Sequence, residues 1–400
     1  MLLINWVQFI KRMIALAIIH VFNCFPIKAN KIFIFSYYGN QYGCNPKYIS
    51  EYILKNYPNK QFDIVWSFND IRNKHQINGI RITKTMSLRY FYELCTSKVI
   101  VTNFRTTDLF IKRKSQYYIQ TWHSSLRLKK IEKDAESSLS NEYIRMAKRD
   151  SQKCDLLLSG CKLSTEIFKR AFWYKGDIIE LGTPRNDIFF QDISVLKRKI
   201  LNDLNIPFDA KLVLYAPTFR KDESLDVYDI NYEIVSKKLK EKFGGEWVIL
   251  VKLHPHLIAK SNQLTFTQNV IDATAFDDIQ ELLSISDILI SDYSSLMFDF
   301  AITQRPCFLY VPDLKNYIKT ERDLYFDIQA LPFISAYSNK DLGDKIEAFD
   351  YEKYKKDLTK FLERIGSFED GKASGKLLKH IDEVCFKQKR RRKNYATEAI

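Results

Sequence analysis

The sequence has few of the residues on which several large classes of protein depend. It contains 12 glycines, and neither G-x-x-x-x-G-K nor G-x-G-x-x-G occurs, which argues against P-loop ATPases and dinucleotide-binding enzymes. The 7 cysteines are scattered without C-x-x-C spacing, which excludes a disulfide framework and a cysteine zinc site and fits a reducing cytosol. No D-x-D motif occurs either, so we expect no tightly bound metal or other cofactor.

The N-terminal segment lacks the length of a membrane span. Lys11 and Arg12 interrupt its apolar run, and the remainder, 13–27, is shorter than the roughly 20 residues that cross a bilayer. No small-residue cleavage site follows, which argues against a signal peptide. On a helical wheel one face carries Leu3, Trp6, Val7, Ile10, Ile14, Ala17, Ile18 and Val21. We therefore predict an amphipathic helix over residues 1–28 in a membrane interface; a helix packed on the protein's own core is the alternative.

Acidic residues are also in deficit. The chain has 48 of them against 62 lysines and arginines, which gives a net charge of +14 and predicts an anionic partner. We find no nucleic-acid-binding module, so we expect an anionic membrane surface or a phosphorylated substrate and no nucleic acid. The basic tail, 386–400, contains KQKRRRKN and is either a second electrostatic contact with the bilayer or a solvated segment. Together these features predict a peripheral (monotopic) protein on the cytoplasmic face of the cell membrane.

Strand and helix patterns alternate through the rest of the chain. Strand patterns occur at 31–38, 62–68, 80–84, 98–103, 117–122, 155–160 and 177–182, and again at 211–218, 246–255, 287–292 and 306–312. Helical patterns occur at 46–57, 87–97, 140–153, 164–172, 232–243, 279–286 and 295–303, with a long helical region after them. This alternation predicts an α/β fold with parallel sheets covered on both faces. We predict a GT-B-like pair of Rossmann-like domains facing across a cleft: an acceptor domain at 29–190 and a nucleotide-donor domain at 191–385.

Unusual polar clusters follow many of these strands, where ligands bind in doubly wound sheets. The stretch QTWHSSLRLKK places His123 beside Trp122 directly after a strand. As a lone residue, this histidine could simply cap a carbonyl group. The stretch VKLHPH ends another strand with Lys252 and His254, and Pro255 fixes the turn that aims His254.

Three further clusters suggest phosphate binding. GTPRND and YAPTFR present Arg185 with Asp187 and Thr218 with Arg220, although a turn and a helix cap explain the first of these as well. In ISDYSSLMFDF a strand leads into Asp292, and a helix opens at a serine pair whose first-turn amide groups can bind an anion. The donor-site prediction therefore comprises Arg185, Asp187, Thr218, Arg220, Lys252, Asp292, Ser294, Ser295 and Asp299. In that set the carboxylate of Asp299 would take a ribose hydroxyl, unless it is a helix-face acid.

The motifs QTWH, GTPRND, YAPTFR, KLHPH, SDYSSLMFDFAITQRP and ERDLYFD occur in the order typical of one family. In this respect residues 30–375 resemble the CDP-glycerol glycerophosphotransferases of teichoic-acid and capsule synthesis. The resemblance implies transfer of glycerol phosphate from CDP-glycerol to a lipid-linked or polymeric polyol-phosphate or glycan acceptor. It also implies that His123 and His254 match the family's two catalytic histidines, and that the DYSS turn holds the diphosphate. Where the family often has W-H-G-T, this chain has Ser124 and Ser125, which restricts the backbone, and we expect an altered acceptor pocket.

The chemistry of phosphoryl transfer fits these residues. It needs positioning, charge neutralisation and a base for the attacking hydroxyl, and histidine is suited to the base role. We expect His123 to be that base and His254 to bind or protonate the leaving diphosphate. Two alternatives are the same fold transferring ribitol phosphate from CDP-ribitol or a sugar from a nucleotide, and a non-catalytic membrane-bound scaffold. The two intact histidines argue against the scaffold.

Overall fold

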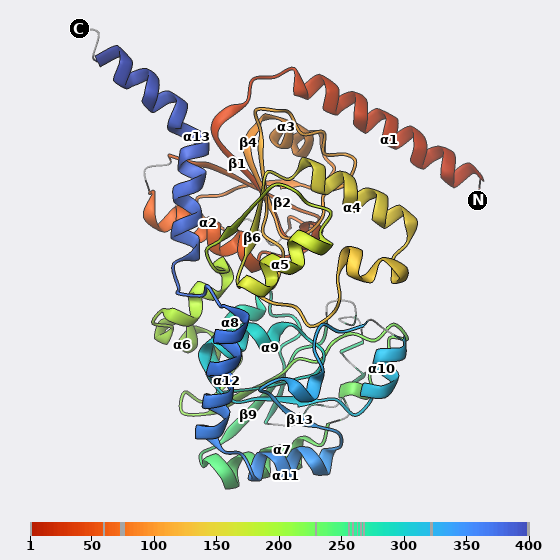
Figure 1. Ribbon diagram of the computed structural model, residues 1–400, viewed down its shortest axis with the longest axis vertical. Coiled ribbons are helices and arrows are strands. Elements are labelled where there is room, and N and C mark those ends of the chain that lie inside the picture. Colours follow the sequence, from red (N-terminus) through yellow and green to blue (C-terminus); the bar gives the residue numbers. More distant parts are fainter. Residues whose placement is uncertain are drawn as a thin grey trace.

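The computed structural model contains two parallel β-sheets, one from each half of the chain, arranged one above the other in Figure 1. It describes residues 2–397 except 59–60, 73–76, 229, 255–256, 258–259, 262, 265, 267–268 and 321–322. The predicted α/β fold with parallel sheets is confirmed by the strand pairing, because every strand pair between described residues is parallel.

The first sheet has the strand order β3-β2-β1-β4-β5-β6-β7 among the described residues. Its strands are β1 (Lys28–Phe35), β2 (Asp63–Phe68), β3 (Arg81–Lys84), β4 (Ser97–Thr102), β5 (Tyr117–Gln120), β6 (Leu156–Ser159) and β7 (Asp177–Glu180). Its helices are α1 (Leu2–Asn23), η1 (Tyr37–Gly39), α2 (Cys44–Asn56), α3 (Leu88–Thr96), η2 (Glu132–Ser138), α4 (Asn141–Lys153), α5 (Lys162–Ala171), η3 (Pro184–Phe190) and α6 (Ser194–Asp203).

The second sheet has the order β10-β9-β8-β11-β12-β13 in the part of the chain that the structure describes. Its strands are β8 (Lys211–Tyr215), β9 (Trp247–Val251), β10 (Val270–Asp272), β11 (Ile288–Ser291), β12 (Cys307–Tyr310) and β13 (Ile334–Ala336). Its helices are η4 (Asp226–Tyr228), α7 (Tyr232–Phe243), α8 (Ile279–Ile285), α9 (Leu296–Phe300), η6 (Ala301–Thr303), α10 (Leu314–Thr320), η7 (Ile328–Ala330), α11 (Asn339–Glu347) and α12 (Tyr351–Ile365). The last helix, α13 (Ala373–Thr397), packs on the first sheet.

Each sheet reverses its strand order at one point. In the first sheet the reversal lies between β1 and β4, where Phe35 pairs with Thr102; in the second it lies between β8 and β11, where Tyr215 pairs with Ile290. The apolar runs of these strands are buried, because helices cover both faces of each sheet. Ligands of open parallel sheets bind beyond the strand ends at such a reversal, so the two reversal points position the site.

Five elements differ from the sequence expectation. The strands β10 and β13 and the helix α6 were not predicted, because each strand has only three residues and α6 has no clear apolar stripe. The strand predicted to run to residue 255 ends at Val251, and Pro255 lies outside the described residues. Another predicted strand, 117–122, ends at Gln120, two residues before Trp122.

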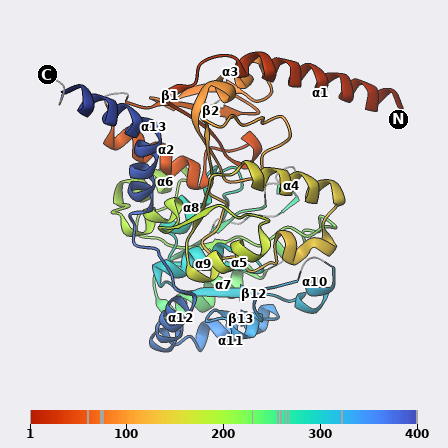
Figure 2. The same ribbon diagram turned by 45° about the horizontal axis from the view of Figure 1, so that its top comes forward.

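The helix α1 runs along the outer edge of the first half and extends away from it at its N-terminus (Figures 1 and 2). Its C-terminal part packs on α3, where Ala15 and Ile19 are buried against Phe91 and Cys95. Nearer the N-terminus the large apolar side chains are exposed: Trp6, Phe9, Ile10, Met13 and Ile14. Both alternatives for this helix therefore have a physical basis, one in each part. None of the described helices has the length and hydropathy that a membrane span requires.

The last helix returns to the first half of the molecule. Leu377, Leu378 and Ile381 of α13 are buried in the core beneath β1 and β4, and Figure 1 shows the helix beside that sheet. The carboxylate of Asp187 accepts hydrogen bonds from the backbone N–H groups of Ala373 (2.9 Å) and Ser374 (2.7 Å), so it caps α13. This crossing was not predicted: the sequence interpretation assigned 191–385 to the second half.

Candidate functional site

A cavity of about 530 Å³ lies between the carboxyl ends of the two sheets. Residues of the first half that line it include Tyr37, Tyr38, Asn40, Gln41, Cys44, Phe104, His123, Lys129 and Arg185. Residues of the second half that line it include Thr218, Lys252, His254, Asp277, Asp278, Tyr293, Ser294 and Ser295. The structure thus brings both predicted histidines, which are 131 positions apart in the sequence (254 − 123), into one cavity.

His123 is held between aromatic rings. Its ring stacks on Phe104, with the centroids 4.8 Å apart and an interplanar angle of 9°, and on Trp122, at 4.5 Å and 29°. Trp122, two residues after the end of β5, has a φ of 51°, which lies in the left-handed region. Nδ1 of His123 lies 3.2 Å from the carbonyl oxygen of Asn103, which can only accept. Nδ1 therefore carries the proton and Nε2 is left as the basic nitrogen.

His254 follows β9 on the opposite side of the cavity. Its backbone N–H donates to the hydroxyl of Tyr228 at 3.1 Å, and its ring lies 5.5 Å from that of Phe219. The predicted role of Pro255 in aiming this histidine falls outside the described residues. The contacts with Tyr228 and Phe219, both of the second half, help to position His254.

Lys252 lines the cavity, but its ammonium group is directed at backbone. Nζ donates to the carbonyl oxygens of Ala273 (3.5 Å), Thr274 (3.2 Å) and Phe276 (2.5 Å). Burial lowers the pKa of Lys252 to about 8, although nearby carboxylates, chiefly Asp277, act in the other direction. The lysine thus holds the loop after β10 in place.

The next predicted residues form a buried cluster beneath the cavity. Asp292 accepts from the backbone N–H (2.8 Å) and hydroxyl (2.9 Å) of Thr218 and from Arg220 (2.9 Å), and Arg220 also pairs with Asp313 (2.8 Å). The guanidinium of Arg220 lies 5.0 Å from the ring centroid of Tyr293. Among the described residues of this cluster, Thr218 and Tyr293 line the cavity, whereas Arg220 and Asp292 lie behind them. The arginine and the aspartate therefore position the strand ends that face a ligand.

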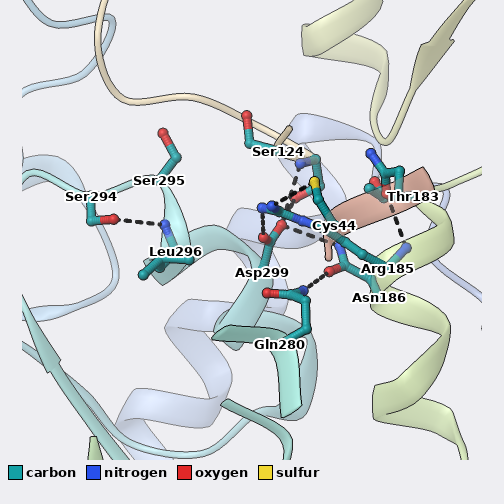
Figure 3. A network of polar contacts seen from close by, with 12 residues as sticks. Cys44, Ser124, Thr183, Arg185, Asn186, Gln280, Ser294, Ser295, Leu296 and Asp299 are labelled. Atoms are coloured by element: carbon teal, nitrogen blue, oxygen red, sulfur yellow. Dashed lines mark hydrogen bonds and ion pairs between the residues drawn. The ribbon is translucent and has the colours of Figure 1, made fainter. Parts of the chain in front are cut away.

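Two hydroxyl groups from the turn before α9 line the cavity. Ser294 Oγ accepts from the backbone N–H of Leu296 at 3.3 Å, and Ser295 Oγ accepts from that of Leu128 at 3.3 Å (Figure 3 shows the first). Accepting a hydrogen bond leaves each hydroxyl its own proton to donate. The amides of Met297 and Phe298 donate to backbone carbonyls of the same turn. The structure therefore offers the serine hydroxyls, rather than the predicted amide groups of Leu296, Met297 and Phe298, to an anion.

A buried network joins the two halves around Asp299 (Figure 3). The carboxylate forms an ion pair with Arg185 and accepts from the hydroxyl of Ser125 (2.8 Å) and the amide of Asn186 (3.2 Å). Gln280 of α8 donates in turn to Asn186 at 2.6 Å. Burial acts to lower the pKa of Arg185, but the Asp299 carboxylate outweighs it and the pKa is raised. Asp299 thus fixes the interface between the halves, and the ribose contact expected of it has no support in these contacts.

Asp187 is separated from the other predicted donor ligands. It does not line this cavity in the described structure and instead caps α13. Glu369, which sequence reasoning missed, accepts from the backbone N–H of Thr183 (3.0 Å) and the amide of Asn186 (3.2 Å), and burial raises its pKa to about 8.

Several other lining residues were also missed: Tyr37, Tyr38, Asn40, Gln41, Cys44, Lys129, Asp277 and Tyr293. Most directly follow a strand or flank a motif already identified, and that position was the available signal. Across the described chain, no group of three or more His, Cys, Asp or Glu side chains is arranged to hold a metal ion.

Residues 17–383, which include both histidines and both halves of the cavity, match the family described as CDP-Glycerol:Poly(glycerophosphate) glycerophosphotransferase. The chain belongs to this family. The resemblance inferred from the ordered motifs is thereby confirmed, and the protein is a member of a family of transferase enzymes.

Relatives of known name are similar over most of the chain. The Bacillus spizizenii teichoic acid poly(glycerol phosphate) polymerase is 34% identical over 88% of this chain and 92% of its own length. The Staphylococcus aureus teichoic acid glycerol-phosphate transferase is 32% identical over 93% and 98%. The chain spans about half the length of two other polymerases it matches, 50% of that of Staphylococcus epidermidis and 42% of that of Bacillus subtilis.

Solved structures agree with the fold. The wall teichoic acid polymerase TagF is 30% identical, with a TM-score of 0.81 over 95% of this chain and 98% of that one. A variant of the same polymerase soaked with CDPG has the same identity and a TM-score of 0.81. The Staphylococcus aureus MnaA–UDP structure is 13% identical with a TM-score of 0.52 and shares the fold alone.

Proposed function

We propose that this protein transfers glycerol phosphate from CDP-glycerol to the end of a polyol-phosphate or glycan acceptor in teichoic-acid synthesis. The observation that carries this proposal is the cavity that His123 and His254 share, in a chain of the glycerophosphotransferase family. Names of relatives support it: they include glycerol-phosphate polymerases, a transferase and primases. A role in capsule synthesis belongs to the same proposal, since the product chemistry is the same.

The reaction assigns complementary tasks to the two histidines. An acceptor hydroxyl attacks the phosphorus that carries glycerol, the bond from that phosphorus to the bridging oxygen breaks, and CMP leaves. Nε2 of His123 accepts the hydroxyl proton, because Nδ1 is committed to the carbonyl of Asn103. His254, on the donor side, binds or protonates the leaving phosphate of CMP. No step in this scheme requires a group other than the side chains of the chain and its two substrates.

The donor diphosphate is assigned to the second half of the cavity. The hydroxyls of Ser294 and Ser295 can donate to phosphate oxygens, and Thr218 forms the neighbouring strand end. This places donor and acceptor across the junction of two Rossmann-like halves, a GT-B-like arrangement. The acceptor hydroxyl then approaches from the side of His123 and Phe104.

The test is a turnover assay with a choice of donors. CMP release from CDP-glycerol and from CDP-ribitol is measured with polyol-phosphate and lipid-linked acceptors. The proposal expects acceptor-dependent release from CDP-glycerol. A preference for CDP-ribitol would favour ribitol-phosphate transfer, the activity in the names of two relatives that are 26% identical. Release from neither donor, nor from nucleotide sugars, would leave the non-catalytic scaffold as the better account.

The exposed apolar part of α1 supports a peripheral membrane location. Trp6 is 64% exposed and Phe9 57% exposed on a helix whose other end is packed on the protein. We propose that this surface lies in an anionic bilayer on the cytoplasmic face and brings the cavity to a lipid-linked acceptor.

Vesicle co-sedimentation at low and high salt tests the membrane proposal. The variant Trp6→Ser/Phe9→Ser leaves the buried contacts of Ala15 and Ile19 intact and is expected to lose binding at both salt concentrations. The variant Arg12→Gln is expected to lose only the salt-sensitive part. If the first variant binds vesicles like the wild type, the basic tail, 386–400, becomes the candidate membrane contact.

A further inference from the structure

The turn that presents His123 has a strained backbone. Trp122, directly before it, has a φ of 51°, in the left-handed region that a bulky side chain seldom adopts. Such a conformation persists only where the surrounding structure holds it. The backbone N–H of Trp122 donates to the side chain of Gln120, and its carbonyl accepts from the hydroxyl of Thr121, both at 2.9 Å. These contacts lie within the turn, so they fix its shape but not its place in the cavity.

Asn45, in the first turn of α2, supplies a contact from outside the turn. The residue is fully buried, and its Nδ2 donates to the carbonyl oxygens of Thr121 (3.3 Å) and Trp122 (3.1 Å). An asparagine near a helix start often caps its own helix, but this amide group reaches across to the segment after β5. Nδ2 thus holds the two peptide groups that directly precede His123.

The other end of the same amide group contacts the network between the halves. Oδ1 of Asn45 accepts from the backbone N–H of Arg185 at 3.0 Å. Arg185 in turn forms its ion pair with Asp299 of the second half (Figure 3). Because an N–H group can only donate and a carbonyl can only accept, these partners fix which way round the amide lies. One side chain therefore connects the turn before His123 to the contact between the two halves.

We propose that Asn45 is a positioning residue for the general base: it holds the turn at Trp122 so that Nε2 of His123 faces the acceptor hydroxyl. The inference rests on the proposed function, in which His123 takes the proton of that hydroxyl. Asn45 is not among the described residues that line the cavity, so it acts through His123 and touches neither substrate. Since the same amide binds Arg185, the place of the base also depends on the contact between the halves.

The first experiment compares turnover with donor affinity. Asn45→Ala removes all three hydrogen bonds and is expected to lower kcat for CMP release about 10-fold or more, because a displaced base is far less effective. The Kd of CDP-glycerol, measured by calorimetry, is expected to stay within about twofold of the wild type. Added to His123→Ala, Asn45→Ala is expected to cause no further loss of rate, because no base remains to be positioned. Asn45→Asp keeps the acceptor for Arg185 but loses both donations, and is expected to lower kcat as well.

Ser50→Ala is the matched control within α2. The Ser50 hydroxyl accepts from Nε1 of Trp66 and donates to the carbonyl of Pro46, both at 2.8 Å, so this variant also removes buried hydrogen bonds. It is expected to lower the melting temperature and to leave kcat and the Kd of CDP-glycerol unchanged. A loss of kcat in Ser50→Ala as large as in Asn45→Ala would assign the effect to stability and overturn the inference.

NMR of histidine-labelled protein follows His123 without any turnover. The His123 ring resonance, identified by its absence in His123→Ala, is expected to shift in Asn45→Ala and to stay in place in Ser50→Ala. The resonances of His20 and His380, which do not line the cavity, are expected to stay in place in both variants. An unchanged His123 resonance in Asn45→Ala, or a further loss of rate when that change is added to His123→Ala, would overturn the inference. Wild-type protein that releases no CMP from CDP-glycerol would instead contradict the proposed function, and the NMR comparison would still decide whether Asn45 positions His123.

Discussion

The two walls of the cavity differ in their chemistry. The N-terminal wall, formed by Tyr37, Tyr38, Phe104 and His123, is a cluster of aromatic rings in which His123 stacks on Phe104 and the two tyrosines are tilted against Phe104. The C-terminal wall, formed by Thr218, His254, Ser294 and Ser295, offers hydroxyls and a histidine at strand ends. Each wall lies beyond the strand ends of a parallel sheet, near the point where the strand order of that sheet reverses.

In the proposed function the two walls have different tasks. Aromatic rings fix the plane of an imidazole without competing for its nitrogens, which suits a base. Hydroxyl groups donate to phosphate oxygens and suit an anion. The account therefore assigns proton transfer to the N-terminal wall and donor binding to the C-terminal wall, and each prediction below separates these tasks.

The largest effect is expected at the junction of the walls. Asp299→Ala leaves Arg185 buried without its carboxylate, so the free energy of unfolding should fall by about 3–5 kcal/mol. Urea denaturation measures this change in the free energy of unfolding. The control, Asp323→Ala, breaks the half-exposed pair with Lys130 and should cost less than about 1 kcal/mol. Equal small losses in both variants would mean that the network does not hold the walls together.

Removing the base should affect turnover next most strongly. His123→Ala is expected to lower the rate of CMP release by about 10²-fold or more, as for a lost general base. Thermal unfolding should change little, because His123 is only half-buried at the cavity surface. A near-wild-type rate would remove His123 from the mechanism.

Changes in the C-terminal wall should alter the affinity for the donor. Replacing Ser294 and Ser295 together with alanine removes two hydroxyl donors and should weaken CDP-glycerol binding by about 10-fold in calorimetry. Ser138→Ala serves as the control, because the Ser138 hydroxyl donates to the carbonyl of Ala135 and neither residue lines the cavity. If the double variant binds normally, the diphosphate lies elsewhere.

A pH-dependent effect is expected from Glu369 beside the interface network. Its pKa is raised to about 8, chiefly by burial, whereas an unfolded glutamate has a pKa near 4.3. The stability it contributes is thus fully present below about pH 4.5 and is lost as the pH rises toward about 8. Because the residue is half-buried, we expect a slope of about 1 kcal/mol per pH unit, below the limit of about 1.4. Glu369→Gln should flatten the slope in urea denaturation at pH 5, 6 and 7; an unchanged slope would assign it to other groups.

The smallest effect concerns the aromatic stack. Phe104→Leu removes the ring that lies 4.8 Å from His123 and should lower kcat about 3-fold, with KM for the donor unchanged. The pH profile of kcat should shift as well, since the ring plane of the base is no longer fixed. Phe110→Leu, in the core of the same half, should lower stability without either change.

The sequence predicted most of the strands and the residues at their ends because these leave local signals. Apolar runs such as those of β1 and β9 are buried on both faces, and His123 and His254 follow such runs directly. Ser294 and Ser295 were identified for the same reason. The family prediction succeeded because several short motifs kept their order along the chain.

The roles of Asp299, Arg220 and Asp187 could not be predicted in this way. Each is a polar residue close to a strand end, but its partners lie far away in the sequence: Asp299 pairs with Arg185, and Asp187 caps α13. Polar side chains that bind a ligand and those that join two halves of a protein have the same local pattern. Only the three-dimensional contacts separate them, and the same holds for the return of α13 to the first sheet.

The central claim is that the two walls divide donor binding from proton transfer. The most direct test is the Kd of CDP-glycerol for His123→Ala, measured by calorimetry beside its rate of CMP release. The account predicts an affinity within about twofold of the wild type while the rate falls by about 10²-fold or more. An affinity that falls as far as the rate would make His123 a donor ligand and contradict the division between the walls.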